Sequence, residues 1–417
     1  MALLRNIALA LAAFTGLVAY FWSSLSLRAE VLGMTRPKTL LQNLHGEDFY
    51  VIPDTLHCED LHHHLPSGSL FGASEVDPET RWKWFPPIGK FDYKAATTRG
   101  SFVVINPETR SSKRLSLTGF NGPFITHGID IWSSKDEPSS VYIFAVNHLA
   151  NPAYVASEGK IQPEARSQIE VFHHTIGTSE AKHLRSIWHP LIRTPNDIYA
   201  RDRNSIFVTN DHKYRDGLMR YPEDLVLTSA WSEIVSIEIL DMSTKNSSER
   251  INVTSTKPKM QNPNGLGHGK NENEILVVRA AAGILEMAHL DEPFVDPVLH
   301  FTQSLQFNYT LDNPSYFRDP YAKETGRDTS GYVMAGLTRA SKFPNRKGDP
   351  SIATFAPEAD SQSGERILFL DDGKMVSTAS TAVLVAIDPK KNGGNKQAWL
   401  FVTGPMTAGI ASMKIDL

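Results

Sequence analysis

The sequence predicts an all-β protein, because strand-like runs follow one another along most of its length and few segments favour a helix. Runs rich in Val, Ile, Phe and Tyr are bounded by Gly, Pro, Asn or Asp, as strands are. They lie at 101–109, 140–148, 168–174, 205–212, 233–239, 275–287, 365–373, 381–388 and 397–404. Beyond the first 29 residues only 221–230 invites a short helical interpretation, and no G-x-G-x-x-G or P-loop follows a strand.

Chain length narrows the choice among all-β architectures. A chain of 417 residues is too long for one simple sandwich, whereas a barrel or a propeller stays open. Six blades of four strands would use roughly 64 residues each, more than the ~40–45 of compact repeats, so long loops are expected. The polar stretch 243–270 and the Pro/Gly-rich stretch 343–363 would supply some of them. No strong internal repeat is present, so the sequence pattern alone does not decide for a propeller.

Charge excludes one class of partner. The formal net charge is −4 and no block of like charges occurs. Nucleic-acid binding needs a basic face that displaces phosphate counterions, so we expect no nucleic-acid partner.

The amino terminus predicts entry into the secretory pathway. Arg5 precedes an uncharged apolar run at 7–22, which is about 24 Å long as a helix and slightly short of a ~30 Å hydrocarbon core. Residues 1–29 are therefore interpreted as a retained signal-anchor or a cleaved signal peptide, with a buried helix as the third alternative. Retention would give membrane association, and each of the first two places the single domain predicted for 30–417 in the lumen or outside the cell.

Cysteine and glycosylation patterns fit that location. Cys58 is the one cysteine, so an intramolecular disulfide is impossible. Three Asn-x-Ser/Thr tripeptides begin at Asn246, Asn252 and Asn308. The first two are expected on the long surface loop 243–270, whereas Asn308 falls inside a strand-like segment.

Three adjacent acid or amide pairs carry the strongest chemical signal: Glu59-Asp60, Asn196-Asp197 and Asp312-Asn313. Successive side chains of an extended segment point to opposite sides, so each pair could send one oxygen up and one down a central channel. Calcium requires six to eight such oxygens in loose geometry, and the wide spacing excludes an EF-hand. The alternative is that these side chains cap turns.

The order of several motifs resembles the serum paraoxonase/arylesterase family. The segments LHCEDLHHHLPSG, FITHGIDIW, FAVNH, TPNDIYARDRNSIFVTNDH, NPNGLG and LDNPS occur in the family's order, and the tail from 381 to 417 is similar to its last blade. This resemblance extends with gaps from about residue 30 to the carboxyl end. It implies a six-bladed β-propeller that holds two calcium ions in a central tunnel and hydrolyses esters or lactones.

The resemblance also implies the ligands. The catalytic calcium would be held by Glu59, Asn196, Asn264, Asp312 and Asn313, and the structural calcium by Asp60, Asp197 and the carbonyl of Ile129. For Asp312-Asn313 both side chains then serve one ion, contrary to simple alternation.

His127 and His148 match the family's histidine dyad, with the first activating water and the second supporting it. A neutral imidazole suits that role, and a base of ordinary pKa near ~6.5 is expected to govern the rate. The alternative is a pair of channel histidines bonded to backbone. Asp211 and His212 are candidates for the surroundings of the same site.

Several other features of the sequence fall outside this assignment. The run His62-His63-His64 lacks spaced partners for zinc and is expected in a solvated loop before the turn 65–68. The family's disulfide and its rim histidine near 335–340 have no counterpart, which leaves the substrate open. The rival functions are a non-catalytic calcium-braced propeller that binds a partner, and a strictosidine-synthase-like or gluconolactonase-like enzyme.

Overall fold

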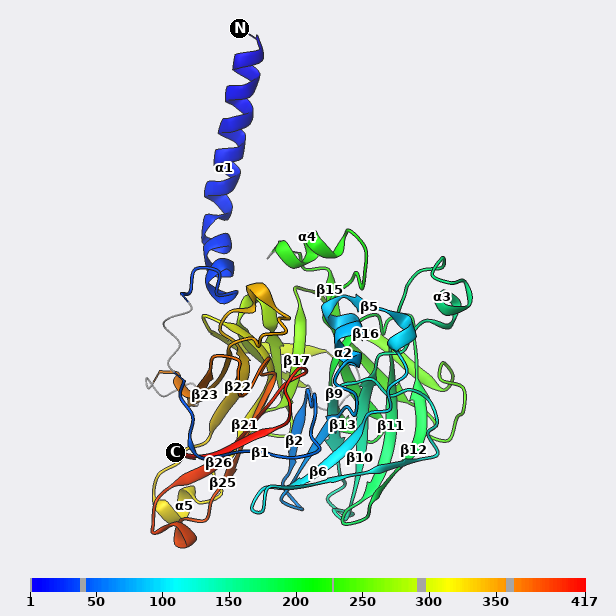
Figure 1. Ribbon diagram of the computed structural model, residues 1–417, viewed down its shortest axis with the longest axis vertical. Coiled ribbons are helices and arrows are strands. Elements are labelled where there is room, and N and C mark those ends of the chain that lie inside the picture. Colours follow the sequence, from blue (N-terminus) through cyan, green and yellow to red (C-terminus); the bar gives the residue numbers. More distant parts are fainter. Residues whose placement is uncertain (1, 38–42, 227–228, 291–297, 358–363) are drawn as a thin grey trace.

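Strands form nearly all of the body in the computed structural model, which describes residues 2–37, 43–226, 229–290, 298–357 and 364–417 (Figure 1). A long helix, α1 (Ala2–Val31), stands away from this body. Short helices lie in the connections: α2 (Thr80–Lys83), α3 (Pro152–Ala156), α4 (Arg220–Leu225), α5 (Ala322–Thr325), η2 (Pro86–Ile88), η3 (Tyr93–Ala95), η4 (Ala280–Ala282), η5 (Ala340–Lys342) and η6 (Pro389–Asn392).

Antiparallel four-stranded units repeat along the chain. The first four are β2 (Leu61–His64), β3 (Ser69–Ser74), β6 (Ser101–Asn106) and β7 (Ser111–Arg114); β9 (Thr126–Trp132), β10 (Ser140–Asn147), β11 (Gln168–Thr175) and β12 (Glu180–Ile187), with β8 (Ser116–Thr118) added at the edge; β13 (Pro195–Asp202), β14 (Ser205–Asn210), β15 (Ser232–Ile239) and β16 (Ile251–Met260); and β17 (Pro263–His268), β18 (Glu274–Arg279), β19 (Ile284–Leu290) and β20 (Leu299–Gln306).

One eight-stranded sheet contains two further units. They are β21 (Thr310–Phe317), β22 (Gly331–Leu337), β23 (Ser351–Pro357) and β24 (Arg366–Asp371), and β25 (Thr381–Ala386), β26 (Gln397–Thr403), β27 (Ala411–Asp416) and β1 (Glu47–Val51). The two units meet through one parallel pair, Asn313 with Thr381. Strand β1 pairs with β27, so the amino-terminal strand completes the carboxyl-terminal unit. A small hairpin of β4 (Trp84–Phe85) and β5 (Lys90–Phe91) lies apart.

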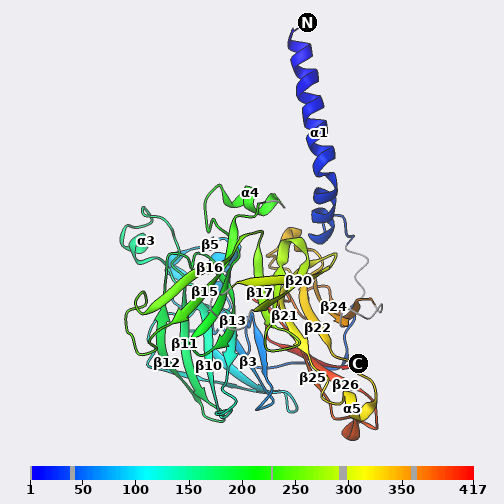
Figure 2. The ribbon, with the colours of Figure 1, turned by 180° about the vertical axis from the view of Figure 1, so that it is seen from behind.

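The first strands of these units form a ring. Strands β2, β9, β13, β17, β21 and β25 each contact the next, and β25 contacts β2 again. In Figure 2 the earlier strands, such as β10, β11 and β15, lie on one side of the body, and the later strands, such as β21, β22 and β25, lie on the other. The predicted all-β, propeller-like architecture is confirmed.

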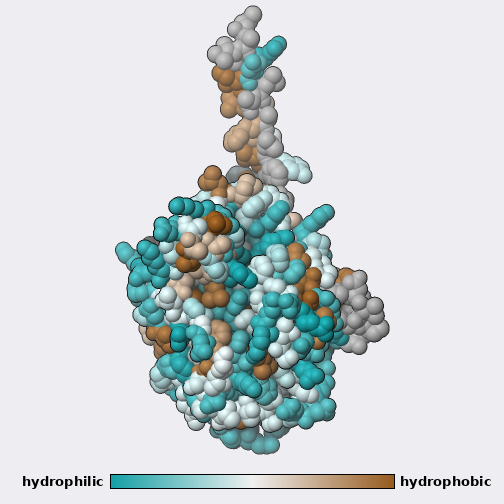
Figure 3. All heavy atoms as spheres, turned by 90° about the vertical axis from the view of Figure 1, so that its right-hand side faces the viewer, coloured by the Kyte–Doolittle hydropathy of each residue, from teal (hydrophilic) through white to brown (hydrophobic). Residues whose placement is uncertain are grey.

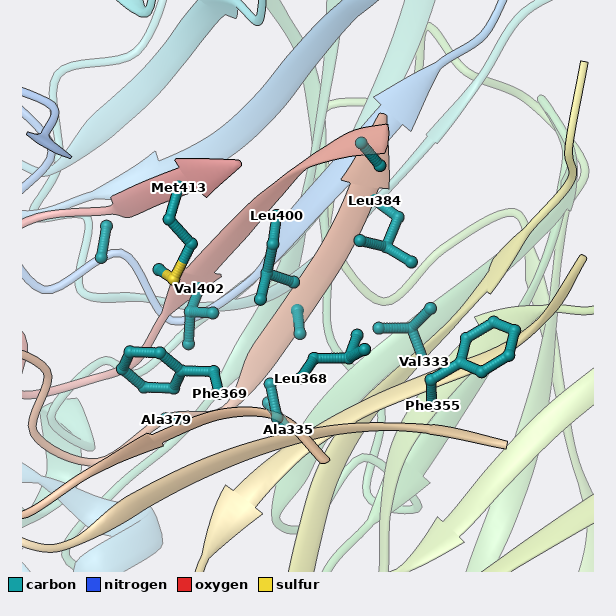
Figure 4. Packing of buried hydrophobic residues seen from close by; sticks show 14 of the residues in the cluster. Val333, Ala335, Phe355, Leu368, Phe369, Ala379, Leu384, Leu400, Val402 and Met413 are labelled. Carbon is teal, nitrogen blue, oxygen red and sulfur yellow. The ribbon is translucent and has the colours of Figure 1, made fainter. Parts of the chain in front are cut away.

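Hydrophobic packing lies between neighbouring units rather than at the centre of the ring. In β18, Leu276 and Val278 pack toward β21–β23, whereas Ile275 and Val277 pack toward β13–β15. Both faces of such a strand are buried, which explains its continuous apolar sequence. Figure 4 shows one of these interfaces, where Leu400 and Val333 come from adjacent units.

The structure corrects several sequence expectations. The run 275–287 is two strands joined by η4, not one. The stretch 243–270 is not a surface loop, because it contains β16 and β17. Only Ile251 and Val253 give β16 an apolar alternation, and its remaining residues are mostly polar, so its period was hidden. The 343–363 stretch contains β23, and its residues 358–363 lie outside the described part of the chain. The helix expected at 221–230 is α4, which ends at Leu225, and residues 227–228 also fall outside the description.

Helix α1 is anchored to the body at its carboxyl end. Val31 is fully buried, and the Arg28 guanidinium donates a hydrogen bond of 3.3 Å to the Ala281 carbonyl. Farther out, Phe14 and Trp22 are each 66% exposed, and Figure 3 shows the helix rising from a mostly hydrophilic surface. Within the described residues, no helix combines the length and apolar character needed to cross a membrane.

Replacing Leu400 by alanine should lower the free energy of unfolding by about 2–5 kcal/mol, because it opens a cavity between two units. The matched control is Leu218→Ala, since Leu218 is 84% exposed and its loss should change stability by less than about 0.5 kcal/mol. Chemical denaturation of both variants measures the difference. Equal stabilities would contradict the packing described for β26.

Candidate active site

Five buried oxygens without a hydrogen-bond partner lie on four segments around the ring. They are Glu59 Oε2, Asn196 Oδ1, Asn264 Oδ1, Asp312 Oδ1 and Asn313 Oδ1. Glu59 precedes β2, and the others lie near the starts of β13, β17 and β21. A buried oxygen that accepts no hydrogen bond costs about 1–3 kcal/mol, so these five oxygens are candidates to bind a cation.

The five residues are called the outer set below, and contacts bring several of its segments together. The Asn313 amide donates to Glu59 Oε1 at 3.0 Å, across 254 residues of sequence. At Gly265, next to Asn264, a Cβ atom would come within 2.5 Å of the Asp312 carbonyl oxygen. Burial raises the pKa of the Glu59 carboxyl well above its ordinary value, and the charges of Asp312 and Asp60 raise it further. The pKa of Asp312 is raised well above its ordinary value, first by burial and then by Asp60.

The three residues predicted for an inner ion also lie together, but their oxygens are already engaged. Asp60 Oδ2 accepts from the Ile129 amide at 3.0 Å, and Asp60 Oδ1 accepts from the Leu61 amide at 2.8 Å. Asp197 accepts from the amides of Ile198 and Leu266, each at 2.7 Å. In each of the first two acid pairs, the second side chain (Asp60 or Asp197) therefore accepts backbone hydrogen bonds, whereas the first holds an oxygen without a partner among the described residues.

His62 occupies the inner end of this arrangement, and the expectation of a solvated histidine loop is wrong. His62 to His64 form strand β2, and only the turn after them is as predicted. His62 lies between Asp60 at 3.0 Å and Asp130 at 3.2 Å, and His268 meets the other Asp130 oxygen at 2.8 Å. Burial lowers the pKa of His62, but the two carboxylates outweigh it and raise that pKa to about 9.

That inner cluster was not found from sequence. Asp130 and His268 stand 138 residues apart in the chain. Each lies within or directly after a motif to which another role was assigned. A signal that could have indicated Asp130 is its position as a charged residue inside the strand-like segment FITHGIDIW. In the described part of the chain, no group of three or more His, Cys, Asp or Glu side chains has metal-holding geometry. The outer set takes three of its oxygens from asparagine amides and so is of another kind.

The two predicted dyad histidines are in contact. His148 Nε2 lies 3.0 Å from His127 Nδ1, and His148 Nδ1 lies 2.8 Å from Ser167 Oγ. The remaining His127 nitrogen, Nε2, faces Glu59 Oε1 at 3.9 Å. Thus the dyad reaches the outer oxygen set through His127.

Electrostatics keep both imidazoles neutral. Burial lowers the pKa of His127 to about 3, assisted by the positive charge of Arg81. Burial and then His127 and Arg81 lower the pKa of His148 well below its ordinary value. The sequence expectation of a base titrating near ~6.5 is therefore revised downward.

Aromatic residues fix the dyad, and sequence reasoning missed them. The Phe85 ring meets His127 edge-on at 4.9 Å and His148 at 5.5 Å between ring centroids. The Trp84 indole donates to the His148 carbonyl at 2.7 Å. The aromatic cluster in RWKWFPP was a signal that could have found them.

A small pocket lies beside the dyad. Its lining includes His148, Ser167, Asp211, Arg215 and Arg220. Asp211 Oδ2 lies 3.2 Å from His212 Nδ1. Asp211 therefore lines the pocket, in agreement with its candidacy from sequence, and His212 contacts Asp211.

The chain is similar to known proteins in sequence and in fold. Residues 95–260 match the Arylesterase family model. Serum paraoxonase/arylesterase 2 of Gallus gallus is 28% identical over 65% of this chain and 66% of its own length, and serum paraoxonase/arylesterase 1 of Mus musculus is 32% identical over 41% and 42%. The chain thus matches slightly less than two thirds of the first relative and under half of the second. A calcium-binding regucalcin from Agrobacterium tumefaciens is 9% identical with a TM-score of 0.42, covering 87% of this chain and 91% of its own.

Gly128→Ala should destabilise the protein by about 1–3 kcal/mol or prevent folding, because atoms of the neighbouring strand leave no space for a methyl group. An added Cβ would lie 2.4 Å from the Asn196 carbonyl oxygen and 2.5 Å from Asp197 Oδ1. Gly122→Ala is the control, since there the nearest atom is the Phe120 ring at 3.7 Å. Thermal unfolding of both variants decides, and equal melting temperatures would contradict this close approach.

Proposed function

The chain belongs to the serum paraoxonase/arylesterase family, and on that premise we propose that it is a calcium-dependent hydrolase of esters or lactones. One observation carries the proposal. Each of the five residues that the family resemblance assigns to the catalytic calcium holds a buried oxygen without a hydrogen-bond partner among the described residues. Calcium prefers such carboxylate and amide oxygens, and its charge would offset the repulsion between Glu59 and Asp312.

The ring of strands is interpreted as six blades, with the ligand set at one end of the tunnel. Glu59, Asn196, Asn264, Asp312 and Asn313 would hold the catalytic ion. Asp60, Asp197 and the Ile129 carbonyl would hold a second ion, although the carboxylates of this set already accept hydrogen bonds. The donor chemistry therefore supports the outer site more strongly than the inner one.

The bound ion supplies positive charge that polarises a substrate carbonyl. The chain's own residues handle the proton. In the tautomer whose Nδ1–H donates to His148 Nε2, His127 would present the electron pair of Nε2 toward Glu59, and the Pro195 backbone is a further hydrogen-bond partner of this ring. His127 takes a proton from the attacking water there, and His148 and Ser167 stabilise the resulting charge.

Location and surface modification are also proposed. Asn246, Asn252 and Asn308 are all exposed, as glycan acceptors must be. Asn308 lies in the connection between β20 and β21, not inside a strand as the sequence pattern indicated. These features support passage through the secretory pathway, with residues 1–29 as signal peptide or membrane anchor.

Calcium should raise the melting temperature of chelator-treated protein. Binding to the folded state alone adds about 2.7 kcal/mol at a concentration 100 times Kd. Asp312→Asn should reduce this shift and abolish hydrolysis of phenyl acetate and of a lactone, whereas the exposed Asp136→Asn should do neither. Calorimetric titration and thermal unfolding measure these effects. Full activity and an unchanged melting temperature in excess EGTA would end the calcium proposal, and calcium binding without hydrolysis would favour the non-catalytic alternative.

His127→Gln should lower kcat by about 10²–10⁴-fold with calcium still bound, because a positioned base is lost. His148→Gln should cost less, and the half-buried His289→Gln on β19 is the control. The base works when unprotonated, and its pKa of about 3 leaves it so at neutral pH. We therefore expect kcat to stay level from pH 5 to 8 and to fall only in stronger acid. A rate that rises through pH 6.5 in wild type, or near wild-type turnover in His127→Gln, would refute this role.

A further inference from the structure

A buried guanidinium lies beside the dyad without belonging to it. Arg81 stands on α2, and its side chain is fully buried. Its positive charge meets Glu75, also fully buried, with Arg81 Nη2 and Glu75 Oε1 3.7 Å apart. Neither residue belongs to the motifs from which the site was predicted.

Fold stability does not account for this pair. The Nε and Nη1 groups of Arg81 are buried and have no hydrogen-bond partner among the residues that the structure describes. Each such donor costs about 1–3 kcal/mol, and a buried ion pair often stabilises no better than apolar side chains of similar size. An arrangement of this cost indicates a role at the neighbouring site.

The Arg81 side chain joins three segments that carry site residues. Its Nη2 group donates to the His57 carbonyl at 3.2 Å, two residues before Glu59. The same group donates to Thr126 Oγ1 at 3.0 Å, and Thr126 directly precedes His127. The guanidinium also lies 4.2 Å from the centre of the Phe85 ring, which packs against both histidines.

Glu75 completes this connection. Its Oε1 accepts from the Thr126 amide at 3.1 Å and from the Thr126 hydroxyl at 3.4 Å. Thr126 is therefore held from two sides, by the carboxylate and by the guanidinium. Because Thr126 and His127 are adjacent on β9, fixing the first limits the movement of the second.

We propose that Arg81, with Glu75 as its counterion, is a positioning residue that fixes His127 relative to Glu59 in the candidate active site. This inference rests on the proposed function, in which those two side chains serve the hydrolysis. Arg81 acts through the His57 carbonyl, Thr126 and Phe85. A shift of about 1 Å between groups that act together can cost 10²-fold in rate.

The test replaces both charges, so that neither is left unpaired. Arg81→Met/Glu75→Gln should lower kcat for phenyl acetate by about 10²-fold, with KM changed less than about threefold. In the full chain, hydrogen exchange followed by mass spectrometry should show faster exchange at residues 56–61 and 125–129. Arg81→Lys keeps the charge but not the planar donor group, and should retain about a tenth of wild-type kcat.

The matched control is Lys396→Met/Asp319→Asn, which removes an ion pair between the β21–β22 connection and the β25–β26 connection. It should lower the melting temperature without changing kcat or exchange at the two segments. If kcat falls equally in the control, or if the Arg81 and Glu75 variant keeps wild-type kcat and exchange, the inference is wrong. Should that variant not fold, an Arg81→Lys enzyme with unchanged kcat and exchange overturns it. A wild-type protein without hydrolase activity refutes the proposed function instead, and the exchange comparison still decides the positioning.

Discussion

Repulsion among buried carboxylates at the centre of the ring is the constraint on which the rest of the structure depends. Glu59, Asp312 and Asp197 all have a pKa raised well above the ordinary value, by burial first and then by neighbouring carboxylates. Charges of one sign are rarely collected in a protein interior without a counter-charge. The fold holds them there through strands that are fixed elsewhere, and a cation would relieve the cost.

The placement of the hydrophobic packing makes this centre available. Apolar clusters fill the interfaces between neighbouring four-stranded units, as Leu276 and Ile275 on opposite faces of β18 illustrate. Because the first strands are held from both sides, their inner ends can carry polar side chains without collapse. The five oxygens without partners are thus supported by packing to which they contribute little.

The buried carboxylates at the two ends of the central cluster have different positively charged neighbours. At the inner end, His62 supplies positive charge between Asp60 and Asp130, and backbone amides satisfy the remaining oxygens. At the outer end Arg81 is the nearby cation, and Glu75 partly neutralises it. The outer oxygens consequently keep their capacity to bind an ion. The same positive charge favours neutral histidines in the dyad, which is the form that accepts a proton.

Residue identity and order by themselves determined the strand-rich fold, the acid and amide pairs, and the two histidines. Each depends on local properties: side-chain period, ligand chemistry, or a motif such as PNDI. Only the tertiary structure decided which oxygen of each pair remains without a partner. The Ile129 amide that satisfies Asp60 lies 69 residues away, and the Asn313 amide that meets Glu59 lies 254 residues away. Likewise, the position of His62 in strand β2 and the contact of Arg81 with Thr126 depend on elements that meet only after the ring closes. Local sequence predicts what a side chain can do, but hydrogen-bond partners and desolvation are set by segments distant in the chain.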